Sequence, residues 1–158
     1  MIVFLAFNKI SFAAEPLAFL AKADQVTLYE GFPHPLFEAK LLKAELKSKK
    51  TIEIDSYPFY QEILQLNQEN TDQLKNLIGK IKDVTVGTKR CGGFHPDYAI
   101  IWHVDGKDYA TLVCFSCAEV KFFEETSSVT YELNGFSDDF KNILQAYQKN
   151  RPKKTKSH

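Results

Sequence analysis

The dipeptide Asp105-Gly106 limits the fold of this chain more than any other feature. It lies between two runs rich in β-branched and aromatic residues, at 97–104 and 107–115. Asp-Gly between such runs is a strong signal for a two-residue turn, because both central residues of that turn need positive φ. The sequence therefore predicts a central β-hairpin formed by these two runs.

A two-residue turn also fixes the register of this hairpin, because every facing pair keeps the same sum of residue numbers. The expected pairs are Val104–Lys107, Trp102–Tyr109, Ile100–Thr111, Tyr98–Val113 and His95–Ser116. The two ends of the segment 91–117 are thus expected to meet in space.

Hydrophobic patterning around the hairpin predicts a mixed set of strands and helices. Strands are expected at 24–32, within 50–66 and at 127–135, and helices at 35–49, 70–81 and 137–150. Pro58 makes 50–66 either an edge strand or two strands joined at that proline. The helices do not alternate regularly with the strands. We therefore expect one α+β domain, with an antiparallel sheet of about four to six strands and helices packed on one face.

The sequence also predicts two helix caps and the burial of two residues at the start of the first helix. Asn70 or Thr71 is expected to cap the second helix, and Ser137 the third. Leu36 and Phe37 lie near helical spacing with later leucines and are expected to pack into the core.

The two ends of the chain are expected to lie outside this domain. Residues 1–13 are mostly apolar, and Ser11 and Ala13 suit a signal peptidase cut before Ala14. The segment lacks a positive n-region, which a start codon assigned too far downstream would explain; the alternative is a buried N-terminal strand or helix. We expect an exported domain at 14–150, periplasmic or extracellular, and a basic, disordered tail at 151–158.

Composition bears on the partners of the protein. The 20 basic and 20 acidic residues cancel, so no overall field favours nucleic acid. Beyond the N-terminal segment, no run approaches the roughly 20 apolar residues of a transmembrane helix. A transmembrane helix is therefore not expected in the mature chain.

The segment 91–117 holds all 3 cysteines and two of the 4 histidines. Four interpretations stay open. Cys91 can form a disulfide with Cys114 or Cys117. Alternatively, the spacing C-x₃-H-x₁₈-C-x₂-C supplies four zinc ligands, Cys91, His95, Cys114 and Cys117. The C-x-x-C pair can be a redox dithiol, although strand-like residues follow it. Finally, the cysteines can be reduced core residues.

Strand geometry limits how the last two cysteines act together. In a regular strand, Cys114 and Cys117 point to opposite faces. They can reach one site only where the backbone bulges or turns at Phe115 and Ser116.

No complete catalytic set can be recognised in the sequence. A Cys–His pair with His95 as the base lacks an orienting group, and the carboxylates are not paired as acid–base chemistry requires. His103, next to the turn, is expected to be solvated.

We expect a non-enzymatic binding domain without a cofactor, stapled by a disulfide. Its expected binding surface consists of His34, His95 and Asp97, and the sequence does not name its partner. The alternative is a zinc- or thiol-dependent enzyme, or a zinc-stabilised domain, at the four Cys and His residues.

The motifs CGGFHPDY at 91–98 and CFSC at 114–117, with LYEGFPHP at 28–35 and LQAYQKNRP at 144–152, resemble a family of small exported bacterial proteins without an assigned activity. The resemblance covers most of residues 25–152 and implies an exported single domain. Members of that family often carry His after the second Cys of the C-F-x-C motif. This chain has Ala118 there, which weakens a metal or haem role borrowed from the family.

Overall fold

The expected hairpin forms around Asp105 and Gly106, which have φ values of 49° and 74°. The computed structural model describes residues 17–85, 92–124 and 127–152. In it β4 (Tyr98–Val104) and β5 (Lys107–Cys114) are antiparallel neighbours. The predicted register from Val104–Lys107 to Tyr98–Val113 is confirmed. The ladder ends at that last pair, so His95 and Ser116 lie beyond the paired strands.

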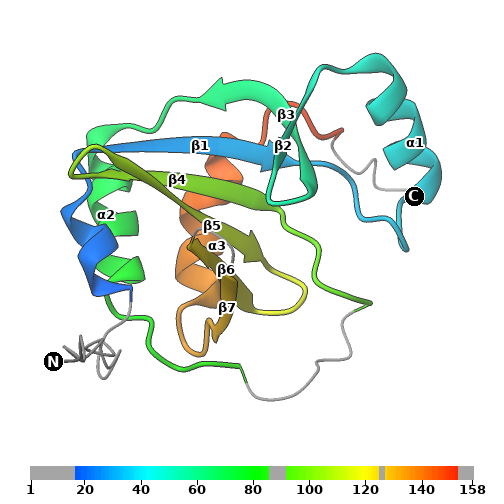
Figure 1. Cartoon of the computed structure of the whole chain (residues 1–158). Helices are drawn as coiled ribbons and strands as arrows, with labels where there is room; N and C mark the ends of the chain where they lie inside the picture. The colour runs from blue at the N-terminus through cyan, green and yellow to red at the C-terminus, as the bar shows by residue number, and fades with distance from the viewer. Residues whose placement is uncertain (1–16, 86–91, 125–126, 153–158) are drawn as a thin grey trace, which may run out of the picture.

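The hairpin is the centre of a seven-stranded antiparallel sheet with the order β2-β3-β1-β4-β5-β6-β7. The remaining strands are β1 (Gln25–Gly31), β2 (Thr51–Ile54), β3 (Tyr57–Leu64), β6 (Glu119–Glu124) and β7 (Ser127–Glu132). The sheet curls into a half-barrel, so that β5 to β7 bend around α3 (Figure 1). The α+β class and the single domain are confirmed.

The sheet has seven strands rather than the four to six expected, because β6 follows β5 where no separate strand was predicted. Residues 51–64 form two strands joined at Asp55 and Ser56, which adopt positive φ of 50° and 69°. Pro58 is therefore not the junction; it lies within β3, opposite Glu53.

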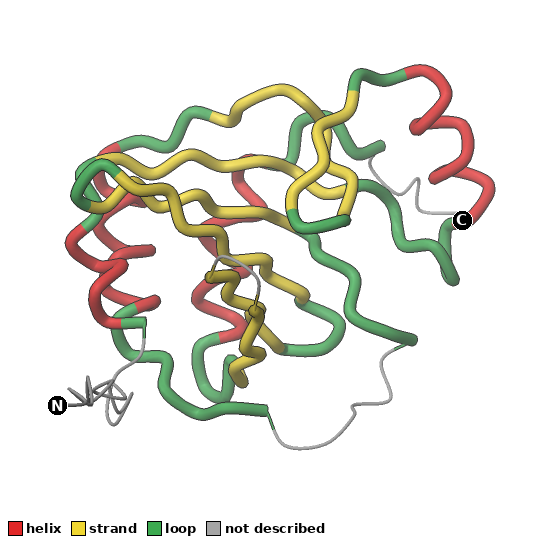
Figure 2. Tube along the Cα trace, viewed as in Figure 1, coloured by secondary structure: helices red, strands yellow, loops and turns green. Residues whose placement is uncertain are grey.

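Two α-helices, α2 (Gln68–Ile78) and α3 (Ser137–Leu144), lie on the concave face of the sheet (Figures 1 and 2). Two short 3₁₀ helices, η1 (Ala18–Lys22) and η2 (Gln145–Tyr147), accompany them. The main core lies between these helices and alternate residues of the strands, including Leu28, Ile100, Trp102, Val113, Val120, Leu74, Ile78, Phe140 and Leu144. This face matches the prediction that helices cover one side of the sheet.

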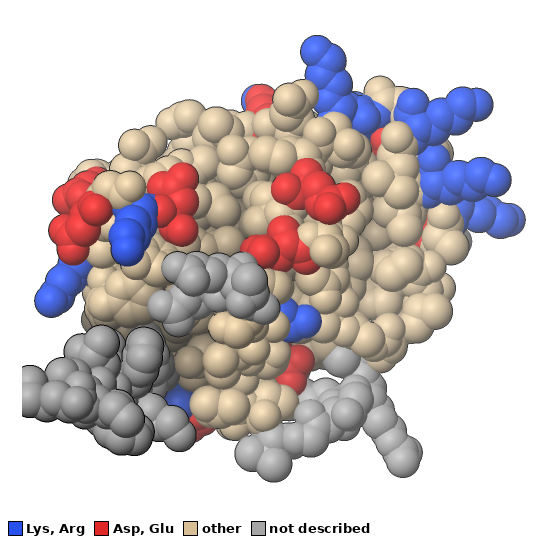
Figure 3. All heavy atoms as spheres, in the orientation of Figure 1, with Lys and Arg blue, Asp and Glu red and all other residues tan. Residues whose placement is uncertain are grey.

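The third α-helix, α1 (Ala39–Ser48), stands at the end of the sheet and has no buried residue. Its lysines point outward at that end (Figure 3). The helix begins at Ala39 rather than at 35, and Leu36 and Phe37, expected in the core, are 65% and 71% exposed. The cause is local, because the segment 32–35, with two prolines, places them on a turn before the helix.

The helix caps also differ from those expected. Asn67, not Asn70 or Thr71, caps α2, and its side chain accepts a hydrogen bond from the Asn70 amide at 2.8 Å. Ser137 is the first helical residue of α3, one position past the N-cap Phe136. Among the described residues, no helix is long and apolar enough to span a bilayer.

Candidate functional site

Cys114 and Cys117 are both buried, at 0% and 4% exposure. Strand β5 ends at Cys114, and the chain then turns through residues 115–118, where Ala118 has φ of 51°. This turn removes the strict alternation that would point the two side chains to opposite faces. Cys114 is a free thiol 3.3 Å from the Ser116 hydroxyl, and Cys117 Sγ lies 3.6 Å from the carbonyl oxygen of Gly93.

The third cysteine, Cys91, lies outside the described residues, so the predicted disulfide of Cys91 and the complete four-ligand zinc site also lie outside them. Within the described ranges, no group of three or more His, Cys, Asp or Glu side chains is close enough to hold a metal ion. The other three members of the alternative zinc set, His95, Cys114 and Cys117, therefore do not form such a group.

The two histidines of the expected binding surface do lie together. The His34 and His95 rings have centroids 4.9 Å apart, and the Phe37 ring is 4.5 Å from that of His34. The loop before α1 supplies His34 and Phe37, and the segment before β4 supplies His95. We call His34, Leu36, Phe37, Phe94 and His95 the tip surface.

Hydrogen bonds of its own loop hold the His34 ring in one orientation. Its Nδ1 accepts from the Leu36 amide at 3.1 Å, and its backbone amide donates to Glu38 Oε2 at 3.1 Å. Since Nδ1 accepts, the ring proton lies on Nε2. The residue is only 9% exposed, and within the described part of the chain Nε2 has no hydrogen-bond partner. His34 thus presents an unsatisfied donor, which is unusual for a buried polar group.

His95 carries no charge at neutral pH. Burial lowers its pKa to about 4, with a further lowering from His34 and Arg151, and the negative charge of Asp97 offsets only part of this. The tip surface therefore has an uncharged imidazole beside the unsatisfied donor of His34.

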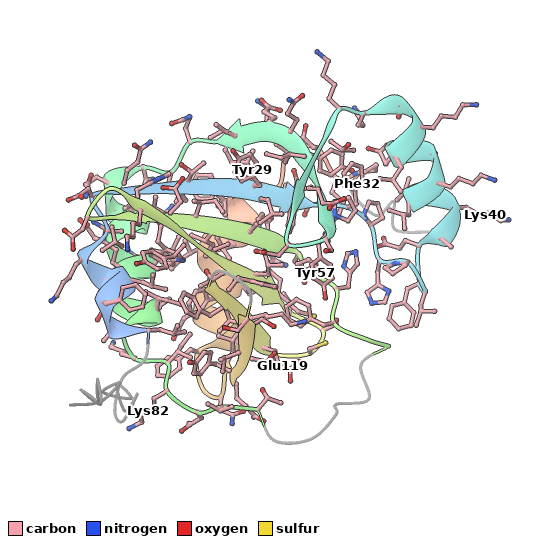
Figure 4. All side chains as sticks on the ribbon, viewed as in Figure 1. Tyr29, Phe32, Lys40, Tyr57, Lys82 and Glu119 are labelled. Atoms are coloured by element: carbon pink, nitrogen blue, oxygen red, sulfur yellow. The ribbon has the colours of Figure 1, made fainter. Side chains whose placement is uncertain are left out.

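Phe94 connects the tip surface to the sheet. The Lys121 amine lies 4.4 Å from the centre of its ring and donates to the Tyr57 hydroxyl at 3.2 Å. A cation over an aromatic face is favourable by about 0.5–2 kcal/mol. Figure 4 shows Tyr57 and Phe32 at the same end of the sheet, with Tyr29 farther along β1. The segment that carries His95 is therefore fixed to β3 and β6 of the sheet.

Asp97, the third expected binding residue, has a structural partner on each carboxylate oxygen. Oδ1 accepts from Arg151 Nη1 at 2.9 Å, and Oδ2 from the Phe115 amide at 2.8 Å. The Arg151 guanidinium also donates to the carbonyl oxygens of Gly31 and Phe32. Asp97 therefore joins three segments that are distant in sequence, and its predicted part in binding stays a prediction.

A second carboxylate completes this arrangement. Glu30 is 1% exposed, and its oxygens accept from the backbone amides of Lys149, Asn150 and Arg151 at 3.1, 2.6 and 3.0 Å. We call Glu30, Asp97 and Arg151 the C-terminal clamp. Arg151, expected at the start of a disordered tail, is held in the folded domain; residues 153–158 lie outside the described residues.

The clamp was missed in the sequence, although its residues occur in the motifs that carry the family resemblance. Glu30 is in LYEGFPHP, Asp97 in CGGFHPDY and Arg151 in LQAYQKNRP. Three motifs that are distant in sequence and carry charged residues of opposite sign are a signal for such a contact.

Comparison with protein-family models, with curated proteins and with solved structures found no match to this chain. The family resemblance described above stays a prediction.

Proposed function

We propose that this protein is a binding domain whose tip surface holds an apolar polypeptide segment of a partner protein without a chemical reaction at that surface. The observation that carries the proposal is the Nε2–H of His34, a buried donor without a partner among the described residues. An unsatisfied buried donor costs about 1–3 kcal/mol, and an acceptor of the partner that reaches Nε2 by displacing the exposed Phe37 side chain would remove that cost.

The surroundings of this donor favour a neutral acceptor. His95 is uncharged at neutral pH because its pKa is about 4, and the Lys121 amine is already bonded to Tyr57. A backbone carbonyl of the partner fits this environment better than an anion, because an anion would need a positive charge nearby.

The exposed side chains beside the donor favour an apolar segment. Leu36 and Phe37 are 65% and 71% exposed and flank the His34 ring. Large exposed apolar side chains that gather at one place are typical of protein-binding surfaces. Phe37 would contribute most as an aromatic anchor.

The stapling disulfide is also a proposal, and we assign it to Cys91 and Cys117. Cys114 is a buried free thiol, which leaves Cys117 as the partner. The Sγ of Cys117 lies 3.6 Å from the carbonyl oxygen of Gly93, two residues from Cys91, and Gly92 and Gly93 adopt positive φ. Such a bond suits the exported location that the N-terminal segment predicts.

Peptide selection tests the binding function. A phage-displayed peptide library is selected on the immobilised full chain, and the affinity of the recovered peptides is measured by calorimetry. Phe37→Ser should weaken binding at least tenfold. The matched control is Val129→Ser on β7, a residue 37% exposed and outside the tip surface, which should leave the affinity unchanged. Failure to recover any peptide, or equal affinities for both variants, would contradict the proposal.

A further inference from the structure

The face of the sheet opposite α2 and α3 carries an open groove of about 380 Å³. One wall is apolar and consists of Tyr29 and four isoleucines, Ile52, Ile54, Ile63 and Ile101. The other end is polar, with Gln25 and Thr27 from β1, His103 from β4 and Asp108 from β5. An apolar groove that ends in a few convergent polar groups is typical of sites for small organic ligands.

The polar groups form one chain of hydrogen bonds. His103 Nδ1 lies 2.5 Å from Asp108 Oδ1, and His103 Nε2 lies 2.9 Å from Thr27 Oγ1. An ionised carboxylate can only accept, so the ring proton of neutral His103 lies on Nδ1. Nε2 is then the acceptor for the Thr27 hydroxyl proton. Hydroxyl, imidazole and carboxylate thus stand in the order and protonation that a nucleophile, a general base and its orienting group require.

The strands fix this geometry. His103 faces Asp108 across the hairpin and Gln25 across the β1–β4 ladder. Thr27 is two residues beyond Gln25 on the same face of β1, so its hydroxyl reaches the imidazole diagonally. Side chains on paired strands are held more rigidly than side chains on loops, which favours catalysis.

We propose that this groove hydrolyses carboxylic esters of small apolar acyl groups, with Thr27 as nucleophile and His103 as general base. The acyl chain lies along the isoleucines, and the ester carbonyl lies at Thr27. The Gln25 side-chain amide, which lines the same end of the groove, donates to the carbonyl oxygen as it becomes negative.

The reaction needs no reactant besides the ester and water. Thr27 Oγ1 bonds to the ester carbonyl carbon while its proton passes to His103 Nε2. The carbon–oxygen bond of the ester breaks, and the alcohol leaves with that proton. Water then attacks the acyl-threonine and gives a proton to Nε2, and this proton returns to Oγ1 as the carboxylic acid leaves. Asp108 is a positioning residue that keeps Nδ1 protonated and stabilises the imidazolium.

This site is separate from the tip surface. The polar end of the groove is at the first residues of β1, and the tip surface begins beyond its last residue, Gly31. A variant that loses ester hydrolysis can therefore still be tested for peptide binding, and a variant that loses peptide binding can still be tested for ester hydrolysis.

The experiment measures release of p-nitrophenol from p-nitrophenyl butyrate by the full chain. Thr27→Val removes the hydroxyl and keeps the shape and strand propensity, and should reduce hydrolysis to the rate without protein. His103→Ala should do the same. Asp108→Asn should lower kcat at least tenfold with little change in KM. The matched control Thr130→Val, on β7, should keep the wild-type rate.

A covalent readout accompanies the kinetics. A fluorophosphonate probe should add one mass increment at the peptide that contains Thr27, and His103→Ala should abolish it. Wild-type hydrolysis no faster than that of Thr27→Val, or labelling at another residue, overturns the proposal. Circular dichroism confirms that each variant is folded; if Thr27→Val is not, the His103→Ala rate and the labelled position decide.

Discussion

Arg151 Nη1 lies 2.9 Å from Asp97 Oδ1, and both side chains are only 18% exposed. The two residues are 54 positions apart in the chain, and the same guanidinium also bonds to the backbone at the end of β1, at Gly31 and Phe32. The segment that presents His95 is therefore held by the C-terminus of the folded domain. The clamp positions the tip surface, and its removal should affect both stability and binding.

The C-terminal clamp predicts a sharp boundary for truncation. A chain that ends at Gln148 leaves the Glu30 carboxylate buried without its three amide donors and Asp97 without Arg151. Removing one side of a buried charged network costs about 3–5 kcal/mol. Urea unfolding should show a loss of this size. The matched control, a chain that ends at Pro152, keeps the clamp and should lose less than about 0.5 kcal/mol; equal stabilities of the two chains would disprove the role of the clamp.

Gly31 is predicted to be irreplaceable for steric reasons. A Cβ there would lie 2.2 Å from the carbonyl oxygen of Pro96, a backbone atom that cannot move aside. Gly31→Ala should destabilise the protein by about 3 kcal/mol or more. At Gly79, which has φ of −65° at the end of α2, the nearest atoms to a Cβ are 3.5 Å away. Gly79→Ala should therefore be neutral or stabilising by up to about 1 kcal/mol. Thermal melts of the two variants check this contrast, and similar melting temperatures would refute it.

The buried His95 predicts a loss of stability in acid. Its pKa falls from 6.5 to about 4 on folding, so the unfolded chain binds the proton more readily. The free energy of unfolding therefore has its full value with respect to His95 above pH 6.5. It falls by about 2 kcal/mol as the pH falls toward 4. Urea midpoints between pH 7 and pH 4 should fall more for the wild type than for His95→Gln. Identical pH dependence of the two proteins would rule this out.

The proposed Cys91–Cys117 disulfide predicts one reactive thiol. Protein from its native compartment, denatured and alkylated without reductant, should carry a single label, on Cys114. Cys117→Ser should destabilise the oxidised protein by about 2–4 kcal/mol, because it frees the loop closed by the bond. Peptide mass spectrometry locates the label. Labels on all three cysteines would exclude the disulfide.

Sequence reasoning predicts the centre of this fold well, because the Asp105-Gly106 turn fixes a register that is local in the chain. It fails where distant residues decide the structure, as in the C-terminal clamp, whose Arg151 bonds to both Glu30 and Asp97. At Leu36 and Phe37 the failure has a local cause, because the prolines before α1 place these residues on an exposed loop despite their helical spacing.

The candidate sites show the same limit. The proximity of His34 and His95 depends on how two loops pack at the sheet end, and no local pattern determines it. The pair His103–Asp108, in contrast, follows from the predicted register and could have been found there. Its connection to Thr27 requires the β1–β4 pairing, which the sequence does not reveal.

The most direct test of the proposed binding function compares two substitutions of His34 with a peptide selected on the wild-type chain. His34→Asn keeps an acceptor for the Leu36 amide near the position of Nδ1 and removes the Nε2 donor, whereas His34→Gln keeps a donor near the position of Nε2. Calorimetry should give an affinity at least tenfold weaker for His34→Asn, with His34→Gln retaining most of it. Equal affinity of His34→Asn and the wild-type chain would contradict the account, because the buried donor would then have no part in binding.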